Sequence, residues 1–318
     1  MRIRWRDPSM SPHKWLKAIV LVIAPFVLFY IVGKPLLQSY MLTHPYRRGA
    51  ELTSQEAGGP VERVHFRATD GVDLAGWFVP GDGSGATIVS SHGSGADGPG
   101  TYPSLAFLNQ AGYNVFILDH RGHGQSGGRF TTMGPLEVSD LVGAVAYLRS
   151  RPDVDPERIG AIGCSMGSGI VIGAAAAEPA IRAVVAESVY ADLGQVWTRF
   201  GAVGLRGTPI HWSWGRPMLW AARLWTGTRI DAFKPEALIG RIHPRPVFLI
   251  QSEHDPTACT IADARRLYRA AGEPKALWVV PEPGHCAAQF FHPQEYQERV
   301  SRFFDQALRN DSSRYYGS

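Results

Sequence analysis

The chain has 318 residues, of which 45% are hydrophobic and 11% aromatic, and its formal net charge at pH 7 is +4. This composition is sufficient for a large buried core and excludes a mainly disordered chain. The basic excess lies in residues 1–48, which hold eight Lys and Arg and one acidic residue, whereas the remainder holds 24 basic and 27 acidic residues. No nucleic-acid-binding surface is therefore predicted for the rest of the chain.

The first apolar segment, "AIVLVIAPFVLFYIVG" (18–33), has 16 residues without a charge. A helix of that length is roughly 24 Å long, slightly shorter than the hydrocarbon core of a bilayer. Residues 15–37 reach a spanning length because Lys17 and Lys34 can extend to the headgroups. We therefore predict a basic tail at 1–14, a transmembrane signal-anchor helix at 15–37 and a linker at 38–60.

The charges around this segment predict its orientation. Five basic residues precede it or stand at its start: Arg2, Arg4, Arg6, Lys14 and Lys17. By the positive-inside rule, the N-terminus is expected in the cytosol and the rest of the chain outside it. A cleaved signal peptide is the alternative, but no A-x-A site follows the apolar run. A buried helix of a soluble domain is disfavoured by the flanking charges.

From residue 61 the chain alternates short apolar strands with helices. The stretch "ERVHFRATDGVDLAGWFVP" (62–80) predicts a β-hairpin around a Thr-Asp-Gly turn. Further strands are predicted at 86–93, 113–119, 158–163, 181–188, 245–251 and 276–280. Helices are predicted at 135–151, 168–178, 261–272 and 293–309, with a loop and short helix before residue 111. This alternation favours one mainly parallel α/β sheet flanked by helices, in a domain at 61–308 with a tail at 309–318.

Residues 192–241 interrupt the alternation between two strands. The segment is about twice the usual crossover length and is predicted to form a cap over the edge of the sheet. It holds five of the nine tryptophans, Trp197, Trp212, Trp214, Trp220 and Trp225. Their rings could face an apolar substrate or simply pack the cap onto the sheet.

Ser165 lies in "GCSMG" (163–167), which fits G-x-S-x-G. The pattern alone is weak, because small residues are common at sharp corners. Here an apolar strand ends at Gly163 and a helix of small residues follows. Glycine at 163 and 167 leaves room for a strained turn that projects the serine hydroxyl above the sheet. This context favours a nucleophile over a merely structural serine.

A serine hydroxyl is a weak nucleophile without a base. His285, in the loop after the last predicted strand, is the candidate base, whereas His292 directly precedes the terminal helix and is predicted to be a surface or capping residue. The base needs an acid that fixes its tautomer. Asp255 ends "VFLIQSEHD" and is the preferred acid because Ser, Asp and His then follow in order on successive strand ends. Glu187, at the end of the preceding strand, is the alternative.

Acyl transfer also requires donors for an oxyanion. The backbone N–H of Met166, at the start of the helix, is the first candidate. The N–H of Ser94, after His-Gly in "SSHGSG", is the second. Each such donor can lower the barrier by roughly 3 kcal/mol in a site from which water is excluded.

Five segments together carry a resemblance to a known superfamily: "SSHGSG" (90–95), "ILDHRGHGQSGG" (117–128), "GCSMGSG" (163–169), "SEHD" (252–255) and "PGH" (283–285). The chain resembles the α/β-hydrolase fold superfamily, in particular membrane-anchored members of the serine aminopeptidase and monoacylglycerol lipase-like branch. The resemblance implies a triad of Ser165, Asp255 and His285, oxyanion donors at Ser94 and Met166, and no cofactor. It also implies that the loop at 119–126 shapes the oxyanion site, so that His120 and His123 need no chemical role.

The expected activity is hydrolysis of carboxylic esters, with a lysolipid or monoglyceride as the expected substrate and the membrane as the expected partner. Acyl-protein thioesterase or aminopeptidase activity through the same triad is an alternative, and an inactive binding module of the same fold is another. Glycines at 93–98 match G-x-G-x-x-G, with Asp119 at the end of the next strand, as in a dinucleotide-binding unit. Pro99 and Pro103 hinder the helix that a pyrophosphate would need there.

The three cysteines match no zinc spacing, and no HExxH is present, so no metal is predicted. Cys164 beside the strand end is expected to be a small buried residue. Cys259 and Cys286 follow the predicted acid and base, whose loops must converge. The sequence therefore allows a disulfide between them if the domain lies outside the cytosol, and it leaves open whether that bond forms. The sequence makes no prediction of oligomeric state.

Overall fold

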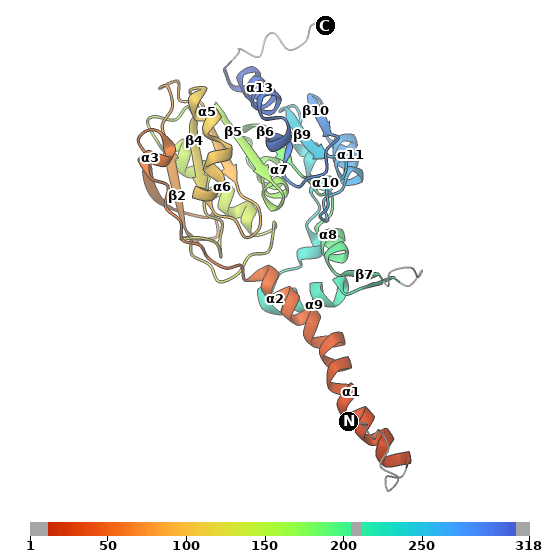
Figure 1. Cartoon of the computed structure of the whole chain (residues 1–318). Helices are drawn as coiled ribbons and strands as arrows, with labels where there is room; N and C mark the ends of the chain where they lie inside the picture. The colour runs from red at the N-terminus through yellow and green to blue at the C-terminus, as the bar shows by residue number, and fades with distance from the viewer. Residues whose placement is uncertain (1–11, 205–210, 310–318) are drawn as a thin grey trace, which may run out of the picture.

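A computed structural model describes residues 12–204 and 211–309 of the chain. Most of the predicted basic tail, the segment 205–210 within the predicted cap, and the predicted C-terminal tail beyond residue 309 lie outside the described residues. The centre is an eight-stranded sheet with the order β1-β2-β4-β3-β5-β6-β9-β10 (Figure 1). Its strands are β1 (Glu62–Arg67), β2 (Asp73–Val79), β3 (Thr87–Ser91), β4 (Asn114–Leu118), β5 (Ile159–Cys164), β6 (Ile181–Glu187), β9 (Val247–Ser252) and β10 (Lys275–Val280).

The sheet is parallel from β4 to β10, and β1 and β2 extend it as an antiparallel hairpin. Every residue of β3, β4 and β9 is buried. This is expected of parallel strands with helices on both faces, and it explains why they are continuous apolar runs in the sequence. The predicted hairpin and the mainly parallel sheet are both confirmed.

Two hydrophobic cores lie on opposite faces of the sheet. One core joins it to α6 (Glu137–Arg149), α7 (Met166–Ala177) and α11 (Ile261–Ala270). The other joins it to α5 (Ala106–Gln110) and α13 (Pro293–Phe304), whose Phe304 is fully buried. Short elements that complete these layers are α3 (Ser54–Ala57), α4 (Gly98–Thr101), η2 (Tyr102–Ser104), α12 (Ala288–Phe291) and η5 (Asp305–Arg309).

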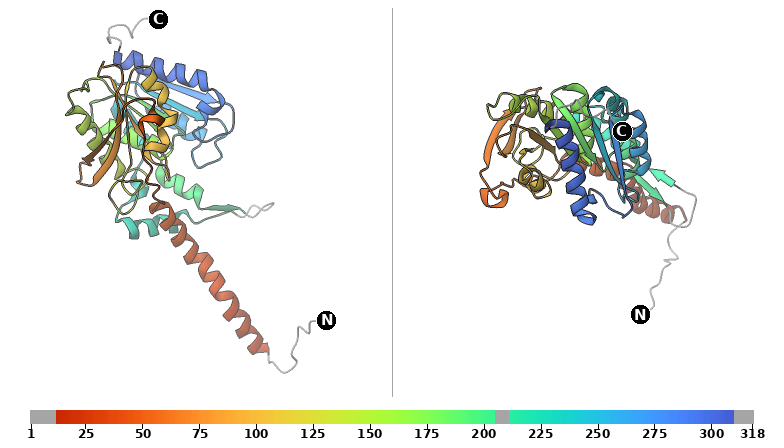
Figure 2. Two further views of the ribbon diagram at one scale, coloured as in Figure 1. Left: turned by 60° about the vertical axis from the view of Figure 1, so that its left-hand side comes forward. Right: turned by 90° about the horizontal axis from the view of Figure 1, so that it is seen from above.

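The N-terminal apolar segment forms one continuous helix that projects from the globular part (Figures 1 and 2). It comprises α1 (Pro12–Leu28), a π-helical turn η1 (Phe29–Gly33) and α2 (Lys34–Thr43). The stretch His13–Thr43 is long and apolar enough to cross a membrane, and its most apolar window is not buried against the rest of the chain. The helix therefore continues past the predicted boundary at residue 37. Its end is attached to the domain, since Ser39 and Thr43 are buried and Thr131 N–H donates to Thr43 O at 2.8 Å.

The described residues of 192–204 and 211–242 form several small elements. They are α8 (Leu193–Phe200), a hairpin of β7 (Ala202–Gly204) and β8 (His211–Ser213), α9 (Gly215–Thr226), η3 (Ile230–Ala232), α10 (Pro235–Leu238) and η4 (Ile239–Ile242). Of these, α9 packs against α2 at the end of the domain from which the N-terminal helix emerges, and α8 packs against α9, whereas α10 and η4 pack against α7 (Figure 1). Trp197 and Trp214 are buried here, whereas Trp220 is 63% exposed. Trp197 and Trp214 therefore pack the segment onto the rest of the protein, which is one of the two roles considered for the tryptophans of the predicted cap.

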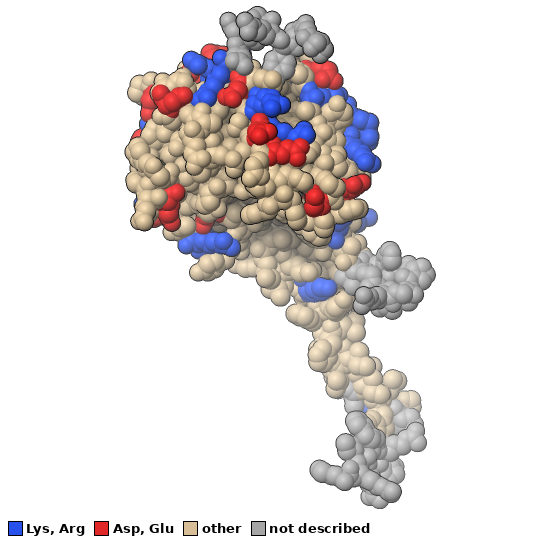
Figure 3. Space-filling view, turned by 45° about the horizontal axis from the view of Figure 1, so that its top comes forward, with Lys and Arg blue, Asp and Glu red and all other residues tan. Residues whose placement is uncertain are grey.

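Charges of both signs are mixed on the upper face of the globular part, and few charges appear along the projecting helix (Figure 3). No single-sign field covers that face, which agrees with the near-neutral composition of the chain after residue 48.

Candidate active site

Ser165 occupies the sharp turn between β5 and α7. Its backbone has φ 56° and ψ −119°, a strained conformation for a residue with a side chain. A Cβ at Gly163 would lie 2.4 Å from Gly167 O, and a Cβ at Gly167 would lie 2.0 Å from Ser91 O. Both glycines are therefore required by backbone contacts, as the sequence pattern predicts. The turn is closed by Ser165 N–H, which donates to Glu187 O at 3.0 Å.

His285 and Asp255 come together from the loops that follow β10 and β9. His285 Nδ1 lies 2.8 Å from Asp255 Oδ2, and the Asp255 side chain is fully buried. Thr257 donates to Asp255 Oδ1 from its backbone N–H at 2.8 Å and from its hydroxyl at 2.7 Å. Burial opposes the charge on Asp255, but the hydrogen bonds from His285 and Thr257 outweigh it and lower its pKa below the ordinary value. An ionised Asp255 only accepts hydrogen bonds, so the ring proton of His285 is placed on Nδ1 and Nε2 is left as the basic nitrogen.

Glu187, the alternative acid, has a different partner. Its Oε1 accepts from Ala288 N–H at 3.1 Å, and burial raises its pKa. The hydrogen bond of His285 goes to Asp255.

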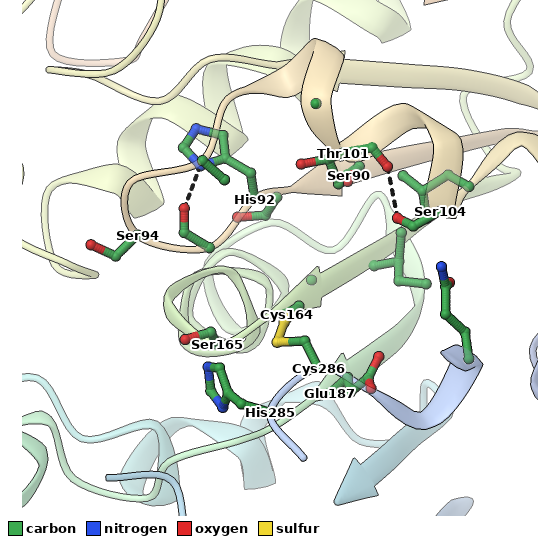
Figure 4. A pocket seen from close by; sticks show the side chains of 18 of the residues that line it. Ser90, His92, Ser94, Thr101, Ser104, Cys164, Ser165, Glu187, His285 and Cys286 are labelled. Atoms are coloured by element: carbon green, nitrogen blue, oxygen red, sulfur yellow. Dashed lines mark hydrogen bonds between the residues drawn. A yellow bond between two sulfur atoms is a disulfide. The ribbon is translucent and has the colours of Figure 1, made fainter. Parts of the chain in front are cut away.

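Ser165 and His285 line the same cavity, with a volume of about 330 Å³. In Figure 4 the Ser165 hydroxyl and the His285 ring lie beside each other at one end of it. Serine hydroxyls from β3 and the loop after it line other parts, together with Glu187 and Tyr296. None of the residues described around this cavity comes from 192–241, so it does not support the prediction that the cap tryptophans face the substrate.

The two predicted oxyanion donors belong to the two segments that adjoin Ser165. Met166 is the first residue of α7, where backbone N–H groups have no partner within the helix. Ser94 lines the cavity from the loop after β3. That loop passes close to Ser165, since a Cβ at Gly93 would lie 3.6 Å from the Ser165 Cβ. The arrangement can therefore accommodate a carbonyl oxygen between the two segments.

A group of buried histidines supports this loop. His92 Nε2 accepts from His120 N–H at 3.0 Å, and its Nδ1 lies 2.8 Å from Gly93 O. Burial lowers the pKa of His92 well below the ordinary value and that of His123 to about 4. The imidazole rings are therefore neutral, and their hydrogen bonds hold the loop in place without adding a positive charge beside the site. His120 and His123 do not line the cavity, which fits the expectation that they need no chemical role.

Asp119 supports the same region. Its two carboxylate oxygens accept from Gly98 N–H and Gln125 N–H, each at 2.7 Å. The glycine-rich segment before it leads into the four-residue helix α4, rather than into a helix that could face a pyrophosphate. The dinucleotide-binding alternative therefore lacks both its helix and its free carboxylate.

These features agree with comparisons to known proteins. Residues 39–280 match the X-Pro dipeptidyl-peptidase (S15) family. The chain belongs to this family. The uncharacterized protein YfhR of Escherichia coli O157:H7 is 30% identical over 257 residues, which are 78% of this chain and 81% of that protein.

Solved structures give the same fold. The esterase Pf2001 of Pyrococcus furiosus has 27% identity and a TM-score of 0.66, covering 83% of this chain and 99% of that one. The α/β-hydrolase GrgF of a Penicillium species has 19% identity and a TM-score of 0.64, covering 78% of this chain and 99% of that one. The expected α/β-hydrolase fold is confirmed, while the resemblance to the monoacylglycerol lipase-like branch stays a prediction.

The disulfide of the structure joins a different pair of cysteines from the one that the sequence left open, Cys259 and Cys286. Cys286 is bonded to Cys164, with 6.1 Å between the two Cα atoms, and Cys259 is free and buried. Cys164 is therefore not simply a small buried residue. The sequence held a signal for this pair, because Cys164 directly precedes Ser165 and Cys286 directly follows His285. When the serine and the histidine meet, these two cysteines come close as well, and the orientation of their side chains in the fold then decides whether they pair.

The turn at Ser165 depends on the absence of a side chain at Gly167. We expect Gly167→Ala to destabilise the protein by about 1–3 kcal/mol, because its methyl group would displace the β3 backbone. Thermal unfolding of the purified protein in detergent measures this effect. Gly93→Ala is the matched control, since its Cβ would meet neighbours only at 3.6 Å. Equal melting temperatures for the two variants would contradict the steric role of Gly167.

Proposed function

We propose that the protein is a serine hydrolase that cleaves carboxylic esters with Ser165 as nucleophile, His285 as base and Asp255 as the acid that orients it. One observation carries the proposal: Ser165, with its strained backbone, lines the same cavity as His285. The Nδ1 atom of His285 lies 2.8 Å from the buried carboxylate of Asp255. Membership of a family of hydrolases and similarity to an esterase support the reaction class.

The geometry suits the following steps. His285 Nε2 takes the proton of the Ser165 hydroxyl as Oγ attacks the carbonyl carbon of the ester. The negative oxygen that forms accepts hydrogen bonds from the N–H groups of Ser94 and Met166. His285 then gives its proton to the leaving alcohol, and water cleaves the acyl-enzyme by the same route. Asp255, kept charged by its hydrogen bonds, stabilises the imidazolium in both steps.

We propose further that the substrate carries an acyl chain and that the enzyme acts at a membrane. The N-terminal helix is long enough to span a bilayer, and α9 lies against its end, with the rings of Trp225 and Tyr40 5.9 Å apart. Next to that contact, α9 exposes Trp220 and Leu224, at 63% and 57%. Large apolar side chains beside a spanning helix are suited to the lipid interface, and residues 192–241 would then form a cap that meets the lipid.

Amide hydrolysis at the N-terminus of a peptide is the second candidate. It is favoured by one observation, the match of residues 39–280 to a family described by its X-Pro dipeptidyl-peptidase activity. The cavity, with its buried carboxyl group of Glu187 and its serine hydroxyls, is polar enough to receive either class of substrate.

Hydrolysis of p-nitrophenyl esters from acetate to palmitate tests the proposed reaction and its substrate. We expect wild-type activity that rises with chain length, and loss of at least about 10⁴-fold in kcat for Ser165→Ala, because removing the nucleophile removes the acyl-enzyme route. A peptide p-nitroanilide with proline in the second position is the comparison substrate. Faster cleavage of that amide would favour the second candidate, and faster cleavage of acetate than of long-chain esters would contradict an acyl-chain substrate. An inert wild-type protein would favour the binding-module alternative.

Two carboxyl-to-amide substitutions separate the roles of Asp255 and Glu187. We expect Asp255→Asn to lower kcat by about 10⁴-fold, because an amide at this position stabilises the wrong tautomer of His285. Glu187→Gln should lower it by less than about tenfold, since its carbonyl oxygen can still accept from Ala288 N–H. Steady-state kinetics on one ester compares them. A larger loss for Glu187→Gln would assign the role of the acid to Glu187.

The proposed anchor and its orientation predict the behaviour of the chain in membranes. We expect the full-length protein to stay in the membrane fraction after alkaline carbonate extraction, because its helix is held by apolar contacts rather than by charge. In closed vesicles of known orientation, protease should digest a C-terminal tag only from the extracytoplasmic face. Release by alkali would contradict the anchor, and digestion from the cytosolic face would contradict the orientation.

A further inference from the structure

We propose that the Cys164–Cys286 disulfide is a positioning device for catalysis: it holds the loop that carries His285 against the turn that carries Ser165, so that full activity requires the oxidised pair. The inference rests on the proposed function and adds two positioning residues to the same site. Neither cysteine is assigned a role as nucleophile or base.

The disulfide joins the immediate sequence neighbours of the two proposed catalytic residues. It joins the residue before the nucleophile to the residue after the base, and it links segments separated by 122 positions. A path of one peptide unit, one disulfide and one further peptide unit therefore connects Ser165 to His285. Figure 4 shows the sulfur atoms between the turn of Ser165 and the loop of His285, at the wall of the cavity that both residues line.

Backbone conformations that are energetically unfavourable for residues with side chains occur around the bond. Three residues with side chains have left-handed φ values here: Ser165 at 56°, Ser188 at 49° and Cys286 at 51°. They belong to adjoining segments, since Cys286 N–H donates to Ser188 Oγ at 2.8 Å. Such conformations cost of order 1–3 kcal/mol each and persist only where the surroundings enforce them. The disulfide supplies that enforcement for the His285 loop.

The other contacts of the loop run to β9 and β6. On the β9 side, Ser252 Oγ donates to Glu282 O at 2.5 Å and His285 Nδ1 lies 2.8 Å from Asp255 Oδ2. On the β6 side, Cys286 N–H donates to Ser188 Oγ at 2.8 Å and Ala288 N–H donates to Glu187 Oε1 at 3.1 Å. These are single hydrogen bonds, each of which can break and re-form. The covalent link runs to β5 and so fixes the histidine relative to the nucleophile. A displacement of about 1 Å between reacting groups can cost about 10²-fold in rate.

Reduction offers a direct test, with a matched control in the same chain. Dithiothreitol supplies two electrons and two protons, so that each sulfur of the pair gains a hydrogen and the reductant closes to its cyclic disulfide. Cys259 forms no disulfide, is buried in the hydrophobic core, and should not respond. Cys259→Ala therefore controls for loss of a cysteine, and Cys164→Ala/Cys286→Ala reproduces the loss of the bond without reductant.

The experiment measures p-nitrophenyl ester hydrolysis by the full-length protein in detergent micelles, before and after dithiothreitol, together with the labelling rate of Ser165 by a fluorophosphonate. We expect reduction to lower kcat by about tenfold or more, with KM changed by less than about twofold because the cavity still binds the ester. The labelling rate should fall with kcat. The double variant should match the reduced wild type and be insensitive to dithiothreitol, and Cys259→Ala should behave like the wild type in both states.

Melting temperatures separate positioning from stability, and all rates are measured well below the melting temperature of each form. A reduced protein or double variant that melts earlier but keeps its kcat would show that the bond serves stability alone, and the proposal would be wrong. An oxidised protein that hydrolyses no ester would contradict the proposed function and the positioning role with it. An active oxidised protein whose kcat is unchanged by reduction would contradict the positioning role only.

Discussion

The close approach of the β5–α7 turn to the end of β3 is the constraint on which the site depends. A side chain at Gly167 would overlap the carbonyl group of Ser91, and one at Gly163 would overlap the carbonyl group of Gly167. Because neither position carries a Cβ, α7 starts directly above the sheet and its first N–H groups face the loop after β3. Ser165 then has one available direction, away from the sheet and into the cavity. The positions of the proposed nucleophile and of the proposed oxyanion donors thus follow from one steric condition.

Around this turn the protein uses buried polar groups as structural parts. Asp119 holds the backbone at Gly98 and Gln125, and Arg121 pairs with Asp140 and Asp70 below it. His92 joins the oxyanion loop to the loop that follows β4. Asp119, Arg121 and His92 thus each have defined partners, which gives the loops one conformation where a wholly apolar interior would allow several. The buried polar side chains of these glycine-rich loops thus hold the backbone rigid at the site.

The N-terminal helix and the segment 192–241 belong to one region of the molecule. The end of the helix is buried against the domain, and α9 lies beside it, with exposed tryptophan and leucine side chains next to the contact. Strands of a parallel sheet present their carboxyl ends to the same edge, where Ser165, Asp255 and His285 are also found. The edge that carries the candidate triad and the exposed apolar side chains of α9 therefore both belong to the part of the domain near the N-terminal helix, as the proposed acyl-chain substrate requires.

The fold class, the order of the strands along the chain and the candidate residues of the site could be predicted from the sequence, because these depend on local signals. Continuous apolar runs indicate buried parallel strands, glycines two positions from a serine indicate the strained turn, and Ser, Asp and His follow the strand ends in order. Only the tertiary structure decided the disulfide partners, the end of the N-terminal helix at Thr43 and the environment of the tryptophans. Each of these depends on which distant segments meet. The Cα atoms of Cys286 and Cys164 lie 6.1 Å apart although 122 positions separate the two residues, a distance that spacing along the chain does not record.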